Sequence, residues 1–308
     1  MQTFSRAHIK QHFDHAAIQY EDAAVLQKRV AKDVDNRLDL ITLNPEVVLD
    51  VGAGTGFLTR HLERRYPQAT CIGLDLSEQM LSLAKNRSLR SSPTWIQRLL
   101  GQSSARTSFI NGDANQLPLA DQSVDLIVTN LMLQWCDDLD LVFSEFRRVL
   151  KPEGLLMMTT FGPDTLKELR QAWAKVDTND HVNTFIDMHD IGDALIRNGF
   201  GQPVLDVEHF TLTYDKPMGV LKDLKAIGAT RVGTTQPNQP AKGLTGKQCF
   251  TQMLDAYDGL RSAGRIPATY EVVHGHAWAS PEIIKGPHRN RQGVVEIRLD
   301  DIPIQQSR

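Results

Sequence analysis

The chain has 308 residues, of which 41% are hydrophobic, so it is long enough for one large α/β domain or a domain with a substantial cap. Its formal net charge of −3 excludes a strong overall attraction to polyanions, and we expect no nucleic-acid partner. Cys71, Cys136 and Cys249 lie far apart without a CxxC pair, which argues against a disulfide framework or a metal site.

The N-terminal segment is polar and helical in pattern. It has no apolar core of signal-peptide length, and the chain has no apolar run of about 18 residues, so we expect a cytoplasmic protein without a membrane span. Apolar residues at Ala23, Leu26, Val30 and Val34 recur every three to four positions and predict helices over residues 8–40. Because this N-terminal lid, residues 1–42, precedes the first strand, it can fold over whatever the strand ends bind.

Short apolar segments then alternate with amphipathic ones, which predict helices over residues 57–65 and 139–150. The second helix stops at residues 151–154, where a basic charge, a proline and a glycine favour termination. Parallel strands need such crossovers, so the alternation predicts a parallel, doubly wound sheet. The predicted strands are Val47–Val51, Thr70–Leu76, Ser108–Asn111, Val124–Asn130 and Leu155–Phe161.

Later segments depart from this alternation. Residues 162–200 are typical of an inserted helical cap, and 231–248, rich in Gly, Thr, Pro and Gln, predict a mobile loop. Two β-patterned runs, Val204–Tyr214 and Ala268–Ala279, flank a predicted helix over 217–229. The core domain thus spans residues 43–280, and 281–308 form a polar C-terminal tail. Residues 87–108 contain no acid and predict an exposed basic insertion with Arg87, Arg90, Arg98 and Arg106.

The turn after the first strand reads Asp50-Val51-Gly52-Ala53-Gly54-Thr55-Gly56. Glycines allow positive φ and let a ligand approach the backbone closely. A dinucleotide fingerprint would need its third glycine at Phe57, and a phosphate-binding loop would need a Lys-Ser/Thr ending. The spacing therefore favours the amino-acid tail of a nucleoside ligand.

Polar residues also end the next three strands. Asp75 can accept hydrogen bonds from both hydroxyls of a ribose, and Asp113 can accept one from an adenine amino group. Asn130 ends the fourth strand, next to the apolar Leu131. Open α/β sheets bind ligands at the carboxyl ends of their strands, so these residues predict one nucleoside site.

These motifs resemble those of the class I S-adenosylmethionine (SAM) dependent methyltransferases. The helix-to-strand junction at residues 145–154 matches as well, with Glu153 where that class usually has a second glycine. The resemblance implies an α/β, doubly wound, mostly parallel seven-stranded Rossmann-like sheet with a reversed C-terminal hairpin. It also implies SAM as cofactor and S-adenosylhomocysteine as product. The cofactor-binding residues that it implies are Asp50, Gly52, Gly54, Gly56, Asp75, Leu76, Asp113, Ala114, Asn130 and Leu131.

The rest of the chain resembles one family, the malonyl-acyl-carrier-protein O-methyltransferases of biotin synthesis. The match covers roughly residues 10–280 apart from the basic insertion and the 231–248 loop. Its most specific segments are Phe161-Gly162-Pro163-Asp164-Thr165-Leu166 and the block 181–195. The resemblance implies methylation of the free carboxylate of a malonyl group on acyl-carrier protein, giving the methyl ester that primes pimeloyl synthesis.

This reaction asks for orientation rather than acid–base chemistry. A carboxylate is already a nucleophile near neutral pH, so the enzyme must align it and exclude water. Tyr20 is the candidate catalytic residue, because the N-terminal helices lie over the strand ends in this fold. The candidate substrate-binding residues are Tyr20, Trp135, Arg148, His181 and Asn183, and structural roles in packing or ion pairing are the alternative.

The carrier protein is acidic as a class, so a basic docking surface is expected, with an evenly solvated surface as the open alternative. Its candidates are the inserted arginines or Arg6, Lys10, Lys28, Arg29 and Lys32. Two other functions fit the cofactor motifs: methylation of another small acid or a quinone precursor, and respiratory-complex assembly by a SAM-binding factor or arginine hydroxylase. No feature of the sequence predicts an oligomeric state.

Overall fold

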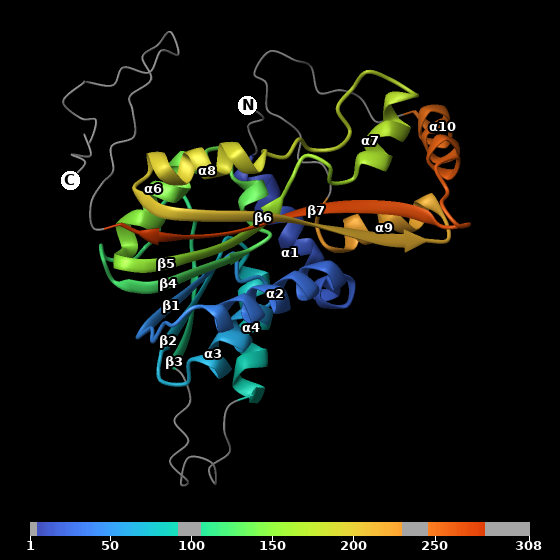
Figure 1. The fold of residues 1–308 in the computed structure, drawn as a ribbon. Coiled ribbons are helices and arrows are strands. Elements are labelled where there is room, and N and C mark those ends of the chain that lie inside the picture. Colours follow the sequence, from blue (N-terminus) through green and yellow to red (C-terminus); the bar gives the residue numbers. More distant parts are fainter. Residues whose placement is uncertain (1–4, 92–105, 230–245, 281–308) are drawn as a thin grey trace, which may run out of the picture.

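The computed structural model describes residues 5–91, 106–229 and 246–280, and its strands form one seven-stranded sheet (Figure 1). The strand order is β3-β2-β1-β4-β5-β7-β6, and β7 alone runs in the direction opposite to that of the other strands. This confirms the predicted doubly wound, mostly parallel sheet with a reversed C-terminal hairpin. The strands are Val47–Val51 (β1), Thr70–Asp75 (β2), Arg106–Asn111 (β3), Val124–Asn130 (β4), Leu150–Phe161 (β5), Phe200–Tyr214 (β6) and Ile266–Ala279 (β7).

Helices cover both faces of the sheet (Figure 1). Successive strand residues point to opposite faces, so Val48 packs into the cluster under α2 and α3, and Leu49 into the cluster under α6 and α8. Helix α6 begins where the Asp138 carboxylate accepts a hydrogen bond from the amide of Leu141 at 3.1 Å. The helices of the two faces are α2 (Val25–Arg37), α3 (Phe57–Arg65), α4 (Glu78–Ser91), α6 (Leu139–Val149) and α8 (Met188–Arg197).

A further layer lies beyond the carboxyl ends of the parallel strands. The β6–β7 hairpin is longer than its neighbour: β5 pairs with β7 over residues 272–278, whereas β6 pairs with β7 from Ile266 onward. The protruding half of the hairpin packs with the helices of this layer around a second apolar cluster that includes Tyr257 and Tyr270. The helices that contribute to this cluster are α1 (Arg6–Ala23), α7 (Lys167–Ala174), α9 (Pro217–Ala226) and α10 (Lys247–Asp258), and the short η2 (Leu133–Trp135) follows β4.

The structure corrects several predicted boundaries. The single N-terminal helical segment is α1, α2 and the short η1 (Leu38–Leu40), with a break at the buried Ala24. The predicted basic insertion includes the end of α4 and the start of β3, and α10 begins inside the predicted 231–248 loop. The predicted cap is divided, because α8 packs under the sheet beside α6 while α7 lies over the strand ends.

Residues 92–105 and 231–245, which belong to those two predictions, lie outside the described residues, as does the predicted tail, 281–308. Within the described ranges, no helix is both long enough and apolar enough to cross a membrane.

Candidate functional site

Three cavities meet at the carboxyl edge of the sheet, and Tyr20 of α1 lines all of them. The turn cavity, about 40 Å³, lies at the glycine turn, and the strand-end cavity, about 110 Å³, lies over the ends of β2, β3 and β4. The large cavity, about 660 Å³, extends from there toward α7, α9 and α10. A ligand in the strand-end cavity and a ligand in the large cavity would therefore meet beside Tyr20.

The glycine turn gives the first two cavities their floor. Gly52 and Gly54 have φ of 77° and 53°, the left-handed region that favours glycine, and both line the two small cavities. A Cβ on Gly52 would lie 2.5 Å from Cγ of Met132, so a side chain there would displace the neighbouring loop. Gly56 lines none of the three cavities, and its φ of 76° instead begins α3.

Two carboxylates flank this turn. Asp50 is buried, accepts a hydrogen bond from Oγ1 of Thr59 at 2.6 Å, and lines the turn cavity. Asp75 lines the strand-end cavity and accepts hydrogen bonds from the amides of Gly54 at 2.8 Å and Ser77 at 2.7 Å. Burial raises the pKa of Asp50 to about 7 and the pKa of Asp75 to about 6. Both groups thus titrate near the physiological range.

The strand-end cavity brings together the other predicted cofactor residues Leu76, Asp113, Ala114, Asn130 and Leu131. One Asp113 oxygen accepts a hydrogen bond from the amide of Asn115, and the other is 2.8 Å from the Arg6 guanidinium of α1. The side chain of Asn130 donates to the backbone carbonyl of Gln27 at 3.1 Å, which connects the end of β4 to α2.

Helix α1 is attached over these strand ends along its whole length. Besides the pair at its first turn, Oδ1 of Asp14 accepts a hydrogen bond from Oγ of Ser77 at 2.6 Å. Near its last turn, Glu21 pairs with Arg60 at 3.0 Å and with Arg87 at 2.6 Å. These contacts place Phe13 and Tyr20 between the strand-end cavity and the large cavity.

Four predicted substrate residues, Tyr20, Trp135, His181 and Asn183, line the large cavity. Burial raises the pKa of Tyr20 well above its ordinary value, so its hydroxyl remains protonated. Within the described residues that hydroxyl has no hydrogen-bond partner. Trp135 packs edge-on against Phe13, with ring centroids 5.3 Å apart, and lines both the large and the strand-end cavity.

His181 and Asn183 enter the large cavity from the segment between α7 and α8. The His181 ring stacks on Trp173, with centroids 3.7 Å apart, and its Nε2 lies 2.9 Å from Asp177. These contacts fix the orientation of the ring. The side-chain oxygen of Asn183 is buried and has no hydrogen-bond partner among the described residues, which leaves it available to a ligand.

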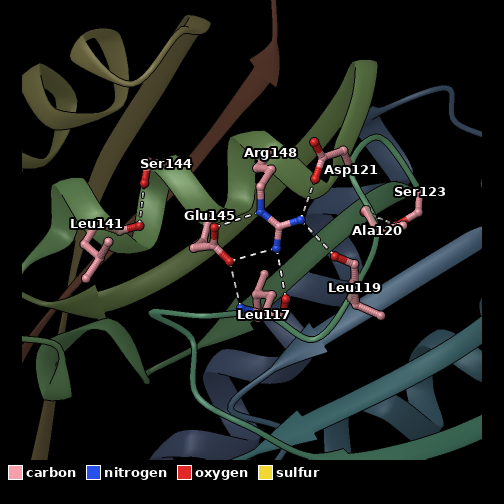
Figure 2. Close-up of polar contacts among 9 residues, drawn as sticks. All are labelled: Leu117, Leu119, Ala120, Asp121, Ser123, Leu141, Ser144, Glu145 and Arg148. Atoms are coloured by element: carbon pink, nitrogen blue, oxygen red, sulfur yellow. Dashed lines mark hydrogen bonds and ion pairs between the residues drawn. The ribbon is translucent and has the colours of Figure 1, made fainter.

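The structure does not bring Arg148 to this site. Its guanidinium donates to Glu145 and Asp121 and to the carbonyls of Leu117 and Leu119, as Figure 2 shows, all at 2.7–2.9 Å. Arg148 ends α6 where the chain enters β5, at the amino edge of β4 and β5, and it lines none of the three cavities. Its predicted substrate-binding role is therefore corrected to a structural one, because its hydrogen bonds hold the loop before β4 against α6.

The candidate docking residues on the N-terminal helices are mostly paired. Arg6, Lys10 and Arg29 form ion pairs with Asp113, Asp14 and Asp33 respectively. The Lys28 amine lies 5.9 Å from the centroid of the Phe57 ring, and Lys32 is exposed. Of the inserted arginines, Arg87 pairs with Glu21, Arg106 is exposed on β3, the side chain of Arg90 is not described, and Arg98 lies outside the described residues.

Sequence reasoning missed other residues of the large cavity. Gln27 lines both this cavity and the turn cavity, and Gln134 faces it from η2. Lys222 and Lys225 line it from α9. Gln27 follows Tyr20 by about seven residues in the predicted N-terminal helical segment, and this spacing could have pointed to it. No local motif marks the two lysines.

One group outside the cavities has residue types that bind metals. Ligand atoms of Asp164, His209 and Glu271 lie within 4.8 Å of one another. Asp164 pairs with Lys167 at 2.9 Å, and a Glu271 oxygen accepts the amide of Asp164 at 2.6 Å. Those contacts give the acids a structural role in holding the Phe161–Leu166 segment against β7, and we assign no metal site to them.

The residues around the two small cavities fit SAM. Gly54 faces open space, because a Cβ added to it would meet nothing within 4 Å. The amino-acid tail of SAM can therefore approach the backbone closely there. Asp75 and Asp113 line the strand-end cavity, where Asp75 would accept hydrogen bonds from ribose hydroxyls and Asp113 would accept one from the adenine amino group. The shared lining of the two cavities makes one continuous nucleoside site.

Replacing Asp75 by Asn will weaken SAM binding about tenfold, because a charged acceptor of two ribose hydroxyls becomes a neutral one. In the unchanged protein, SAM affinity will also fall as the pH drops through about 6, since protonation of Asp75 removes the same acceptor. Isothermal titration calorimetry at pH 7.5 and pH 5 checks both. The exposed Asp255→Asn serves as control, and equal affinities of Asp75→Asn and the unchanged protein would refute the assignment.

Replacing Arg148 by Ala will lower the free energy of unfolding by about 1–3 kcal/mol, because several hydrogen bonds to a charged group are lost. Acceptor KM will not change. Urea denaturation and steady-state kinetics measure the two effects, with the exposed Arg64→Ala as control. A raised KM at unchanged stability would return Arg148 to the substrate site.

Comparison with known proteins agrees with this geometry. Residues 49–158 match a family described as a methyltransferase domain, which confirms the cofactor class and with it SAM. The protein YcgJ of Bacillus subtilis superposes with a TM-score of 0.54 at 15% identity, covering 82% of this chain and 99% of its own. A protein of Bacillus halodurans superposes with a TM-score of 0.53 at 18% identity, covering 81% and 99%. At such identities these structures support the fold alone.

Curated relatives match over most of the chain. The malonyl-acyl-carrier-protein O-methyltransferase of Methylovorus sp. is 49% identical, covering 89% of this chain and 88% of its own. Proteins of the same name from Nitrosospira multiformis and Gallionella capsiferriformans are each 47% identical, covering 88% and 94% of both chains respectively. The chain therefore belongs to the malonyl-acyl-carrier-protein O-methyltransferase family.

Proposed function

We propose that this protein transfers the methyl group of SAM to the free carboxylate of a malonyl group carried by acyl-carrier protein. The observation that carries the proposal is the junction at Tyr20, where the nucleoside site opens into the large cavity. Because this cavity would hold the methyl acceptor, we call it the acceptor cavity. Among the described residues that line this acceptor cavity, none is an aspartate or glutamate. An anionic acceptor therefore meets no repelling carboxylate there. The names and coverage of the relatives support the same substrate.

The chemistry matches the groups at the junction. Bound SAM supplies an electrophilic methyl group on a positively charged sulfur. The bond between a carboxylate oxygen and the methyl carbon forms as the carbon–sulfur bond breaks, and the sulfur keeps the electron pair. No proton is released, so no general base is needed. The residues of this chain have to align the carboxylate and exclude water, and Phe13, Trp135 and Leu131 supply apolar walls for that purpose.

A reacting carboxylate also needs a few oriented hydrogen-bond donors, because a bare buried charge is costly. The protonated Tyr20 hydroxyl, which lacks a partner within the described residues, is well placed to donate to one carboxylate oxygen. Gln27 lies at the same junction and offers an amide donor. Asn183 and His181 stand farther along the acceptor cavity and suit the rest of the acceptor.

The alternative functions have less support. A small free acid would not fill a cavity of about 660 Å³, and the relatives compared are not named as methyltransferases of free acids or quinone precursors. A role in respiratory-complex assembly finds no counterpart among the relatives compared, which carry the name of a malonyl-acyl-carrier-protein O-methyltransferase over 88–98% of this chain.

The direct experiment incubates the protein with methyl-labelled SAM and malonyl-acyl-carrier protein. We expect label on the carrier as a methyl ester, which mild base releases as methanol. Acetyl-acyl-carrier protein, which lacks the free carboxylate, is the matched control and will stay unlabelled. Rescue of a biotin auxotroph that lacks this step is the expected result in cells. Label that resists base, or label on the acetyl control, would contradict the proposal.

Replacing Tyr20 by Phe will lower kcat about tenfold or more and leave the SAM dissociation constant within about twofold, because only the donor to the acceptor carboxylate is lost. Steady-state kinetics and calorimetric SAM titration separate the two effects. Tyr66→Phe, a half-buried tyrosine at the end of α3 that lines none of the three cavities, is the control. Unchanged kcat in Tyr20→Phe would remove the hydroxyl from the reaction.

A further inference from the structure

The acceptor cavity is larger than a malonyl group requires. Its volume of about 660 Å³ falls in the range of about 300–1,000 Å³ that holds drug-sized ligands. The inner end adjoins the cofactor site at Tyr20 and Leu131. The rest of the cavity continues to α9, where its lining becomes exposed. A longer ligand than the malonyl group can therefore occupy it.

Two lysines line the exposed part of the cavity. Lys222 and Lys225 are three residues apart on α9, so their side chains leave the same face of the helix. Val220 of the same helix is fully buried, and Leu221 and Leu224 line the cavity beside the two lysines. Neither lysine forms an ion pair with any residue in the described ranges. The intervening Asp223 is hydrogen-bonded to Tyr214, and it is not part of the cavity lining.

The middle of the cavity has a mixed character. Apolar side chains such as Leu169 and Phe185 line it together with polar ones, and of these the Asn183 oxygen has no hydrogen-bond partner among the described residues. A pantetheine arm has the same character, because its two amides and one hydroxyl are separated by short hydrocarbon segments. The arm of an acyl-carrier protein ends in a phosphodiester, which is a permanent anion.

We propose that Lys222 and Lys225 bind the phosphate of the carrier protein's phosphopantetheine arm and thereby set the depth to which the malonyl group enters. This inference rests on the proposed function. The phosphate holds the outer end of the arm, the buried Asn183 oxygen is available to one of its amides, and the malonyl carboxylate reaches the junction at Tyr20. The lysines supply charge-assisted hydrogen bonds as flexible point charges, which suits a phosphate that enters from solvent.

Three acceptors with the same malonyl thioester test this directly: malonyl-pantetheine, malonyl-4′-phosphopantetheine and malonyl-acyl-carrier protein. We expect the unchanged protein to favour malonyl-4′-phosphopantetheine over malonyl-pantetheine about tenfold in kcat/KM, from two exposed ion pairs. In the double variant Lys222→Gln/Lys225→Gln this ratio will fall to about one. Lys216→Gln, an exposed lysine that precedes α9 and lies outside the cavity lining, will retain the ratio.

High salt will reduce the ratio in the unchanged protein, because the ion pairs are exposed. A ratio near one in the unchanged protein, or the same ratio in the double variant, would overturn the phosphate site. A higher kcat/KM for malonyl-coenzyme A than for malonyl-acyl-carrier protein would overturn the assignment to the carrier's arm.

Binding provides a readout that does not depend on methyl transfer. Calorimetric titration with 4′-phosphopantetheine and pantetheine, both without the malonyl group, will show the same preference and the same loss in the double variant. If the binding preference holds while no acceptor is methylated, the proposed function fails and the phosphate site stands. If methylation proceeds without a binding preference, the phosphate site fails and the proposed function stands.

Discussion

The attachment of α1 to the carboxyl edge of the sheet places Tyr20 where the three cavities meet, and both halves of the site depend on that placement. Three polar attachments, at Arg6, Asp14 and Glu21, are spread along the helix. The exposed ion pair at Arg6 contributes only about 0–1 kcal/mol, and burial of the apolar face of the helix, which includes Ile9, adds to the stability of the contact. The polar contacts define the register in which the helix lies. A small shift of α1 would separate the donor at Tyr20 from the strand ends.

This arrangement explains how a site without an acid–base pair can promote methyl transfer. The acceptor is charged before it binds and the donor carries the opposite charge, so the required work is desolvation and alignment. The α1 ring pair Phe13 and Tyr20 and the η2 residue Trp135 separate the junction from solvent. The absence of carboxylates from the described lining of the acceptor cavity avoids repulsion of the same anion.

Local patterns predicted the fold, and they predicted which residues come together at the carboxyl edge of the sheet. The glycine turn and Asp75, Asp113 and Asn130 follow strands directly, so their positions depend only on where each strand ends. The boundary at Ala24 escaped prediction because no proline or glycine marks it. The full lengths of β6 and β7 were not predicted, because these two strands continue beyond the rest of the sheet by pairing only with each other.

The acceptor side was less predictable, because its residues come from segments far apart in the chain. Arg148 is a candidate only as a donor that a carboxylate could use, but the loop at residues 117–121 supplies its partners. Lys222 and Lys225 belong to no motif, and only the packing of α9 beside the cavity shows that they line it.

The most direct measurement of this account is a crystal structure of the ternary complex with S-adenosylhomocysteine and malonyl-pantetheine. We predict a free carboxylate beside the Tyr20 hydroxyl, with the thioester directed toward α9; a carboxylate directed toward α9 or bound outside the acceptor cavity would contradict the account.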